Sequence, residues 1–229
     1  MHAVYSCATF VLNIVVVCLS ILIKLEINFK VKTMKKTWII LAVIAVFIVI
    51  LVSSFMGSYN KMVSMEEGVK SQWSQVENVY QRRSDLIPNL VSTVKGYADF
   101  EKETLTQVVE ARAKATSVNV NPEKLDAQSL QNFQSAQSGL STALGRLMVV
   151  VEKYPELKAN QGFLDLQAQL EGTENRITVE RQKFNESAQT FNTLIRKFPG
   201  VLYNAFFGFE KKAYFEAEKG AGKAPEVKF

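Results

Sequence analysis

Histidine and cysteine are almost absent from this sequence of 229 residues, and the few that occur lie near its start. The single histidine is His2, and the two cysteines are Cys7 and Cys18. The segment from residue 58 onward therefore has neither. This excludes disulfide bonds, thiolate or imidazole metal sites, and Ser-His or Cys-His catalysis within it. We predict a protein without a catalytic residue, a metal site or a cofactor.

A strong excess of one charge is also missing from most of the chain. The 27 basic and 22 acidic residues give a net charge of +5. Residues 1–57 hold five lysines and one acid, Glu26, and so the remainder of the chain is close to neutral with both signs interleaved. A nucleic-acid-binding protein needs a clustered basic face. The sequence therefore predicts no nucleic-acid partner.

A long apolar run begins at Trp38 and ends at Met56, and its 19 residues carry no charge. A helix of that length, at about 1.5 Å per residue, crosses about 30 Å of hydrocarbon. Lys35 and Lys36 precede the run, which is longer than the apolar part of a usual signal peptide. We therefore predict that residues 34–57 are a retained, single-pass transmembrane anchor in contact with the lipid bilayer.

A second apolar run, residues 3–23, is interrupted by polar residues and has two interpretations. It is either a first hydrophobic span or part of an upstream extension, residues 1–33, that is not native. The second interpretation is favoured, because Met34 followed by Lys35 and Lys36 is typical of the start of a bacterial membrane protein.

The direction of insertion follows from the lysines before the anchor. The basic stretch 24–36 favours the cytoplasmic side of the membrane under the positive-inside rule. Residues 58–229 are then expected on the extracytoplasmic side of a bacterial cytoplasmic membrane, whether or not the first run also spans it.

Apolar residues recur at every third or fourth position from Tyr59 onward, which is the period of an α-helix. Residues 58–117 are predicted to form one long helix, kinked or broken near Leu86 by Pro88, or two nearly collinear helices. The first clear break is predicted just after this segment. There Asn121 is expected to cap the next helix, with the following proline at its first position.

Two further apolar stripes follow, over residues 130–154 and 163–198. Long stripes, short connections and the lack of strand-like alternation indicate a helical bundle. We predict an all-α fold, with an N-terminal transmembrane helix followed by an antiparallel up-and-down bundle of long, kinked helices. The bundle is expected over residues 58–217, and a disordered tail over residues 218–229.

Short motifs occur in a fixed order along the predicted bundle. They are residues 81–91, 94–98, 111–112, 154–160 and 173–177, with Phe163, Arg181, Phe184-Asn185, Phe191-Asn192, Phe198-Pro199, Gly208-Phe209 and Tyr214-Phe215. In order and spacing they resemble the LemA family of bacterial membrane proteins, over residues 35–217. The resemblance implies a single anchor before an antiparallel bundle and no established enzymatic activity. Some family members look like organisers of bacterial membrane compartments.

Charged residues interrupt the apolar stripes and form a candidate polar network. Arg83 and Arg181 fall on the inward faces of two long helices, within reach of several carboxylates. The network is predicted to comprise Glu66, Arg83, Asp85, Glu174 and Arg181, with Glu77 nearby. It would either bind an anionic group or pair charges that fix the register of the helices, and the second interpretation is favoured.

The C-terminal part of the chain is dense in aromatic residues. The cluster comprises Phe198, Tyr203, Phe206, Phe207, Phe209, Tyr214 and Phe215. These side chains would either dock on the membrane interface or on a partner helix, or fold back to close the end of the bundle. The second interpretation is favoured.

Three functions fit these features. The favoured one is a membrane-anchored helical scaffold that works by protein–protein contact, self-association included, without catalysis. The alternative is an accessory or chaperone-like subunit of a membrane enzyme such as a protease. An enzyme that uses a lysine-assisted serine or a carboxylate pair is the least favoured.

Overall fold

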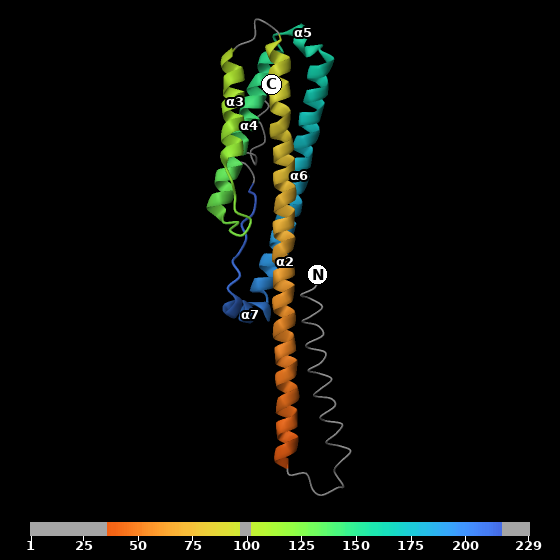
Figure 1. Ribbon diagram of the computed structural model, residues 1–229, viewed down its shortest axis with the longest axis vertical. Helices are drawn as coiled ribbons and strands as arrows, with labels where there is room; N and C mark the ends of the chain where they lie inside the picture. Colours follow the sequence, from red (N-terminus) through yellow and green to blue (C-terminus); the bar gives the residue numbers. More distant parts are fainter. Residues whose placement is uncertain (1–35, 97–101, 217–229) are drawn as a thin grey trace, which may run out of the picture. The chain divides into compact units, whose positions relative to one another are not determined.

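The computed structural model describes residues 36–96 and 102–216, and within these ranges the chain is helical without any strand (Figure 1). The predicted extension 1–33 and the predicted tail 218–229 lie outside the described residues. The helices are α2 (Lys36–Lys95), α3 (Lys102–Ser117), α4 (Ala127–Val151), α5 (Pro155–Lys158), α6 (Gln161–Arg196) and α7 (Gly200–Phe207). The predicted all-α fold is confirmed.

The chain divides into two compact units, Met1–Ser54 and Phe55–Phe229. The described part of the first unit is the beginning of α2, where large apolar side chains such as Val43 (63% exposed) and Phe47 (59%) face outward. Among the residues that the structure describes, α2 is the one helix long and apolar enough to cross a membrane. The apolar beginning of α2 falls within the predicted anchor, residues 34–57, of which residues 34 and 35 lie outside the described part of the chain.

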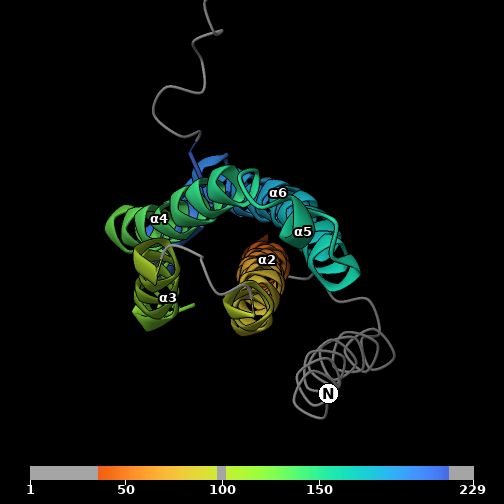
Figure 2. The same ribbon diagram turned by 90° about the horizontal axis from the view of Figure 1, so that it is seen from above.

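Four long helices build the second unit, namely the remainder of α2 together with α3, α4 and α6. They alternate in direction along the chain (Figure 1), and the view along the bundle shows α4 between α3 and α6 (Figure 2). All four contribute to the core, for instance through Ile87, Leu105, Leu140 and Leu170. The predicted antiparallel up-and-down bundle is confirmed.

The first helical segment differs from the prediction. Residues 58–117 form neither one helix nor two collinear ones, because α2 ends at Lys95 and α3 runs back antiparallel to it (Figure 1). The reversal follows Gly96, and residues 97–101 lie outside the described part of the chain. The apolar stripe does not reveal the reversal, since both helices keep the same helical period.

Pro88 lies inside α2, and so, of the kink or break predicted near Leu86, the break does not occur. A proline lacks the N–H that would bond the carbonyl four residues earlier, which here belongs to Ser84. The Arg112 side chain of α3 supplies the missing donor, with its Nε 2.8 Å from the Ser84 carbonyl oxygen. A residue distant in sequence thus satisfies the carbonyl that the proline leaves free.

Because Arg112 replaces the N–H that Pro88 lacks, the contributions of these two residues to the free energy of unfolding should depend on each other. We expect Arg112→Met to cost about 1–3 kcal/mol of unfolding free energy, because the Ser84 carbonyl loses its donor. In a Pro88→Ala background the backbone N–H of residue 88 can bond that carbonyl, and the same Arg112 substitution should cost much less. Urea unfolding of the four proteins in detergent micelles measures this coupling. Equal costs in both backgrounds would contradict it.

The start of α4 also corrects the prediction. Asn121 does not cap the helix, because its Oδ1 accepts a hydrogen bond from the Glu123 N–H (2.9 Å) within a turn. The cap is Asp126, whose carboxylate accepts a bond from the Ser129 N–H at 2.7 Å. This bond lowers the pKa of Asp126. Pro122 thus occupies the turn, and α4 begins at Ala127.

The longest stripe forms most of α6, as predicted. Asn160 caps the helix by accepting a bond from the Phe163 N–H (3.0 Å), and the inward side chains from Phe163 to Ile195 are largely buried. Phe198 departs from the stripe, since the helix ends at Arg196 and the Phe198 side chain is 74% exposed.

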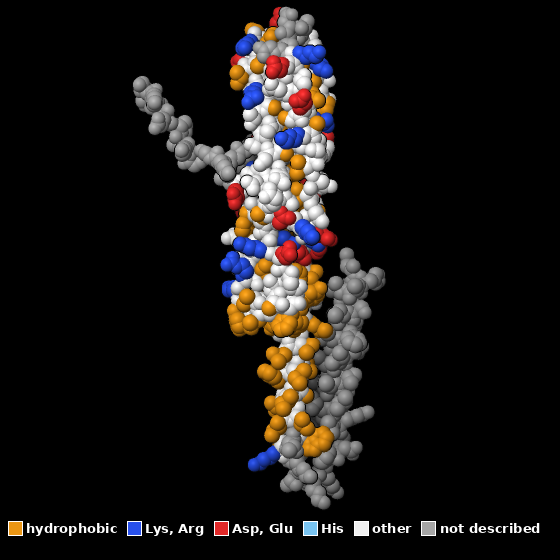
Figure 3. Space-filling view, turned by 90° about the vertical axis from the view of Figure 1, so that its left-hand side faces the viewer, with side chains coloured by type: hydrophobic (Ala, Val, Ile, Leu, Met, Phe, Trp, Pro, Cys, Tyr) orange, Lys and Arg blue, Asp and Glu red, His pale blue; other side chains and the backbone are white. Residues whose placement is uncertain are grey.

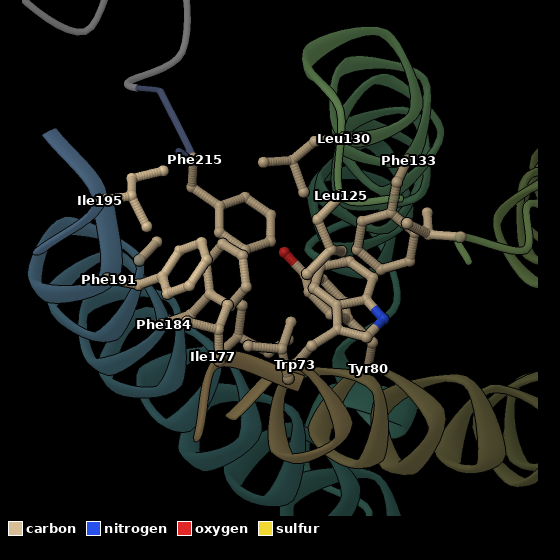
Figure 4. Packing of buried hydrophobic residues seen from close by; sticks show 14 of the residues in the cluster. Trp73, Tyr80, Leu125, Leu130, Phe133, Ile177, Phe184, Phe191, Ile195 and Phe215 are labelled. Atoms are coloured by element: carbon tan, nitrogen blue, oxygen red, sulfur yellow. The ribbon is translucent and has the colours of Figure 1, made fainter. Parts of the chain in front are cut away.

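The core consists of two apolar clusters that follow each other along the bundle. The first surrounds Trp73 and draws on α2, α4 and α6 (Figure 4), and the second lies around Leu90 and Leu140. In α2 the first cluster ends at Tyr80 and the second begins at Ile87. Between them, residues 81–85 are polar or charged, and Leu86 already packs against the second cluster.

Candidate functional site

A buried polar layer separates the two apolar clusters. Its centre is Arg83, which is 2% exposed. One terminal nitrogen of its guanidinium lies 2.8 Å from Glu174 Oε2 and 3.0 Å from Ser141 Oγ. The other donates to Gln137 Oε1 at 2.6 Å. The Arg83 Nε has no hydrogen-bond partner among the described residues.

Gln137 connects this layer to a further helix. Its Nε2 donates to the Ala115 carbonyl of α3 at 3.2 Å, while its Oε1 accepts from Arg83. The layer therefore links all four long helices through side chains of α2, α4 and α6 and a backbone carbonyl of α3. Such directional bonds hold at one register only, because a shift of one helix by a turn would leave Arg83 buried without partners.

The other members of the predicted network lie elsewhere. Asp85 accepts a hydrogen bond from Gln81 (2.7 Å) on the exposed side of α2. Arg181 lies over the Phe215 ring, 4.7 Å from its centre, and also donates to the Glu216 carbonyl. The structure thus brings Arg83 and Glu174 together and leaves Glu66, Asp85 and Arg181 outside their cluster.

Two titratable groups on α2 near this layer have shifted pKa values. Burial raises the pKa of the Tyr80 phenol, although the neighbouring Arg181 and Arg83 oppose the shift. Burial also raises the pKa of the Glu77 carboxyl. The Tyr80 phenol therefore stays protonated at neutral pH, with its ring 5.1 Å from the Arg83 guanidinium.

Glu66 pairs with a second buried cation, Lys212, which is 3% exposed. The Lys212 Nζ lies 2.7 Å from Glu66 Oε1 and donates to the Glu123 carbonyl at 3.1 Å. It also lies 5.8 Å from the centre of the Phe191 ring. The lysine therefore ties the C-terminal segment to α2 and to the turn before α4.

The C-terminal strap, residues 209–216, is bound to α6 by two asparagines. Asn192 donates to the Lys212 carbonyl (2.8 Å) and accepts from the Lys212 N–H (2.9 Å). Asn185 makes the same pair of bonds with Phe215, at 3.0 and 2.8 Å. Each carboxamide thus satisfies one donor and one acceptor of the strap backbone, as a neighbouring β-strand would.

The spacing of these two pairs fixes the conformation of the strap. Asn185 and Asn192 are two helical turns apart, a rise of about 10.5 Å. The three steps along the chain from Lys212 to Phe215 cover the same distance, which requires a nearly extended chain at about 3.3 Å per residue. The strap therefore runs antiparallel to α6 in extended form.

The predicted aromatic cluster is divided between the strap and α7. Phe215 enters the core, where its ring stacks on Trp73 and meets Phe184 edge-on (Figure 4). In α7, Phe207 contacts Phe55 and Tyr59 of α2, and Tyr203 contacts Phe55. Phe209 lies against the core and Tyr214 bonds Asn192, whereas Phe206 and Phe198 are exposed.

The chemistry available in these clusters is limited. Within residues 36–96 and 102–216, no group of three His, Cys, Asp or Glu side chains could hold a metal ion. An open groove of about 580 Å³ runs beside the strap and is lined by polar side chains that include Arg181, Gln182 and Glu186. The buried cations, Arg83 and Lys212, are held by oxygen atoms of the bundle itself.

Comparison with known proteins identifies the family. The LemA family model matches residues 72–229. The chain belongs to the LemA family. Magnetosome protein MamQ of Magnetospirillum gryphiswaldense is 29% identical over 206 residues, which cover 82% of this chain and 75% of that protein. Magnetosome protein MamQ 2 of Paramagnetospirillum magneticum is 30% identical and covers 79% and 72%, respectively. Protein LemA of Metamycoplasma hominis is 24% identical and covers 63% and 62%.

The LemA-family match includes the two buried cations and the strap. The burial of Lys212 has no signal in the sequence, because a lysine in a charged C-terminal segment is usually exposed. The two asparagines do have a signal in the sequence. Phe-Asn occurs at residues 184–185 and again at residues 191–192, so that two turns of α6 each place a core ring beside a carboxamide.

Proposed function

We propose that this LemA-family protein is a membrane-anchored helical scaffold that acts by binding protein, further copies of itself included, and not by catalysis. The observation that carries the proposal is that the buried charged side chains bond to other groups of the bundle. Arg83 and Lys212 are the buried charged side chains among the described residues, and both are held by bonds that fix the bundle. No substrate is needed to account for them.

The outer surface of the bundle offers a place for a protein partner. An open groove of about 540 Å³ lies between α3 and α4, and its lining includes Gly145, Val149 and Val150. Val149 is 69% exposed. A membrane anchor raises the effective concentration of such a surface toward other membrane proteins, since it confines both to two dimensions.

Photo-crosslinking in intact cells tests this proposal. A photoreactive phenylalanine analogue replaces Val149 in the groove, and Val179 of α6, 48% exposed, in a matched control. We expect adducts at position 149 that are lost when the anchor is removed. Self-adducts support the scaffold, and one recurrent foreign adduct would instead favour an accessory subunit of a membrane enzyme. Equal, sparse labelling at both positions would contradict the proposed function.

The polar layer around Arg83 is assigned to helix register and not to ligand binding. Glu174 is half exposed and can be solvated alone, so Arg83→Met should leave a folded protein, within about 2 kcal/mol of the original. The adducts at position 149 should persist. A variant that unfolds normally in urea but loses its adducts would show that the layer belongs to a binding site.

We also propose that the bundle lies on the extracytoplasmic side of a bacterial cytoplasmic membrane, which the lysines before the anchor support. The absence of cysteine after residue 18 makes a direct test simple. With Cys7 and Cys18 replaced by serine, a Gln128→Cys variant should react with a membrane-impermeant maleimide in intact cells or spheroplasts. Reaction only after lysis would place the bundle in the cytoplasm.

A further inference from the structure

Helix α7 has an inner face that packs on the start of the second unit. The Phe207 ring lies 4.6 Å from the Phe55 ring and 4.9 Å from the Tyr59 ring, and Tyr203 meets Phe55 at 5.4 Å. At the start of α7, a Cβ on Gly200 would collide with the Leu194 carbonyl oxygen, and so only glycine fits. Both ends of the helix are therefore held against the bundle.

The outer face of α7 is apolar and exposed although the helix itself is fixed. Phe206 is 80% exposed, Leu202 55% and Val201 46%, and the neighbouring Phe198 is 74% exposed. These residues follow a helical spacing along one side, and α7 contains no charged residue. A contiguous exposed apolar face of this kind marks a surface that binds a membrane or another protein.

The position of α7 along the chain indicates what covers this face. Phe55, which contacts Tyr203, Phe206 and Phe207, belongs to the apolar run that ends at Met56. Tyr59 follows one turn later. These contacts join α7 to the residues at which the run ends, and so α7 packs on the part of the chain that would leave the hydrocarbon. Aromatic residues are enriched where a helix leaves the hydrocarbon.

Exposed basic side chains lie close to the apolar face in the sequence or next to the residues that α7 contacts. Lys61, Arg196, Lys197 and Lys211 are exposed, and Glu210 is the only acid between residues 193 and 211. Figure 3 shows hydrophobic side chains gathered at the end of the bundle that α7 occupies, with lysine and arginine side chains next to them. This combination matches the surface of a membrane that contains anionic lipids, to which an apolar face and nearby cations both bind.

We propose that the outer face of α7 lies in the lipid surface of the membrane that anchors the chain. Phe206, Leu202 and Phe198 enter the boundary between headgroups and acyl chains. The exposed basic side chains near α7 contact anionic headgroups. The bundle is then held to the membrane at two places, the anchor and α7, which restricts its tilt. This inference goes beyond the proposed scaffold function and does not depend on a protein partner.

Depth-dependent quenching in vesicles tests the proposal with the full chain. Cys7 and Cys18 are replaced by serine, and an environment-sensitive nitrobenzoxadiazole label is attached to a Phe206→Cys variant. The protein is reconstituted in vesicles of phosphatidylethanolamine and phosphatidylglycerol that contain nitroxide-labelled lipids. A matched variant, Val179→Cys, carries the label on an exposed position of α6, outside the α3–α4 groove.

We expect a blue-shifted label at position 206 that nitroxides near the headgroups quench more than nitroxides near the chain ends, because an interfacial helix lies about 5–10 Å into that boundary. The label at position 179 should be neither shifted nor quenched. A label at position 206 without quenching would overturn the proposal. If its blue shift then falls as the protein-to-lipid ratio is lowered, a second copy covers α7. If the shift is constant, the bundle itself shields the label.

Discussion

Phe215→Ala is expected to lose about 3–5 kcal/mol of unfolding free energy, although Phe215 lies close to the C-terminus. Its side chain is 6% exposed and occupies the space among Trp73, Phe184 and Arg181. Truncation removes the ring and leaves a cavity in the apolar cluster around Trp73 (Figure 4). The strap that carries Phe215 is pinned by asparagines, and so the chain cannot easily close the gap.

Urea unfolding in detergent micelles measures this loss. The chain has two tryptophans, and a Trp38→Phe background leaves Trp73, which stacks on Phe215, as the reporter. Phe206→Ala is the matched control, with an expected change below about 1 kcal/mol because Phe206 is 80% exposed. Similar losses for the two variants would show that Phe215 is not a core residue.

Asn192→Ala should have the second largest effect. The side chain is 2% exposed and satisfies both the N–H and the carbonyl of Lys212. An unsatisfied buried polar group costs about 1–3 kcal/mol, so that we expect a loss of about 2–5 kcal/mol for the two groups together. The same substitution frees the strap around Lys212, and proteolysis should then cut the chain between α7 and Phe215.

Limited proteolysis and urea unfolding together measure this effect. Asn132→Ala provides the control, because Asn132 is exposed and its carboxamide bonds only the exposed Gln128 among the described contacts. It should change stability by less than about 0.5 kcal/mol. If Asn192→Ala resists proteolysis as the original protein does, the two carboxamide bonds do not hold the strap.

The helical pattern predicts much of this fold because the buried positions recur with the period of an α-helix. The stripe in α6 correctly indicates the inward positions from Phe163 to Ile195, since each faces the other helices of an antiparallel bundle. The reversal after Gly96 gives no comparable signal, because α2 and α3 have the same period on either side of it. The continuation of α2 through Pro88 depends on Arg112, which local sequence cannot indicate.

The polar contacts were harder to predict than the apolar ones. Arg83 interrupts an apolar stripe, and this position alone indicates that it is buried and needs partners. Its bond to Gln137 and the pairing of Glu66 with Lys212 join residues far apart in the chain, and so they follow only from the packed helices. Lys212 is buried because the strap passes between α6 and the turn before α4, a path that helical periodicity does not describe.

The aromatic residues near the C-terminus were predicted as one group, but the chain separates them. Gly208, with φ of 72°, ends α7 in a left-handed conformation that favours glycine, and the chain turns back along α6. The residues before it stay with the start of the second unit, whereas Phe215 enters the core. A short reversal at one glycine therefore separates the aromatic side chains that pack at the start of the second unit from Phe215, which enters the core.

Counting the chains in membrane discs cut directly from cells tests the central claim, that this protein works through protein contact at a membrane. Styrene–maleic acid copolymer excises such discs without detergent, and mass spectrometry with single-molecule bleaching reads their contents. The account predicts a fixed number of copies above one, or a constant ratio to one other protein, that Val149→Lys in the α3–α4 groove lowers. Discs that hold one copy and no recurrent companion would contradict it.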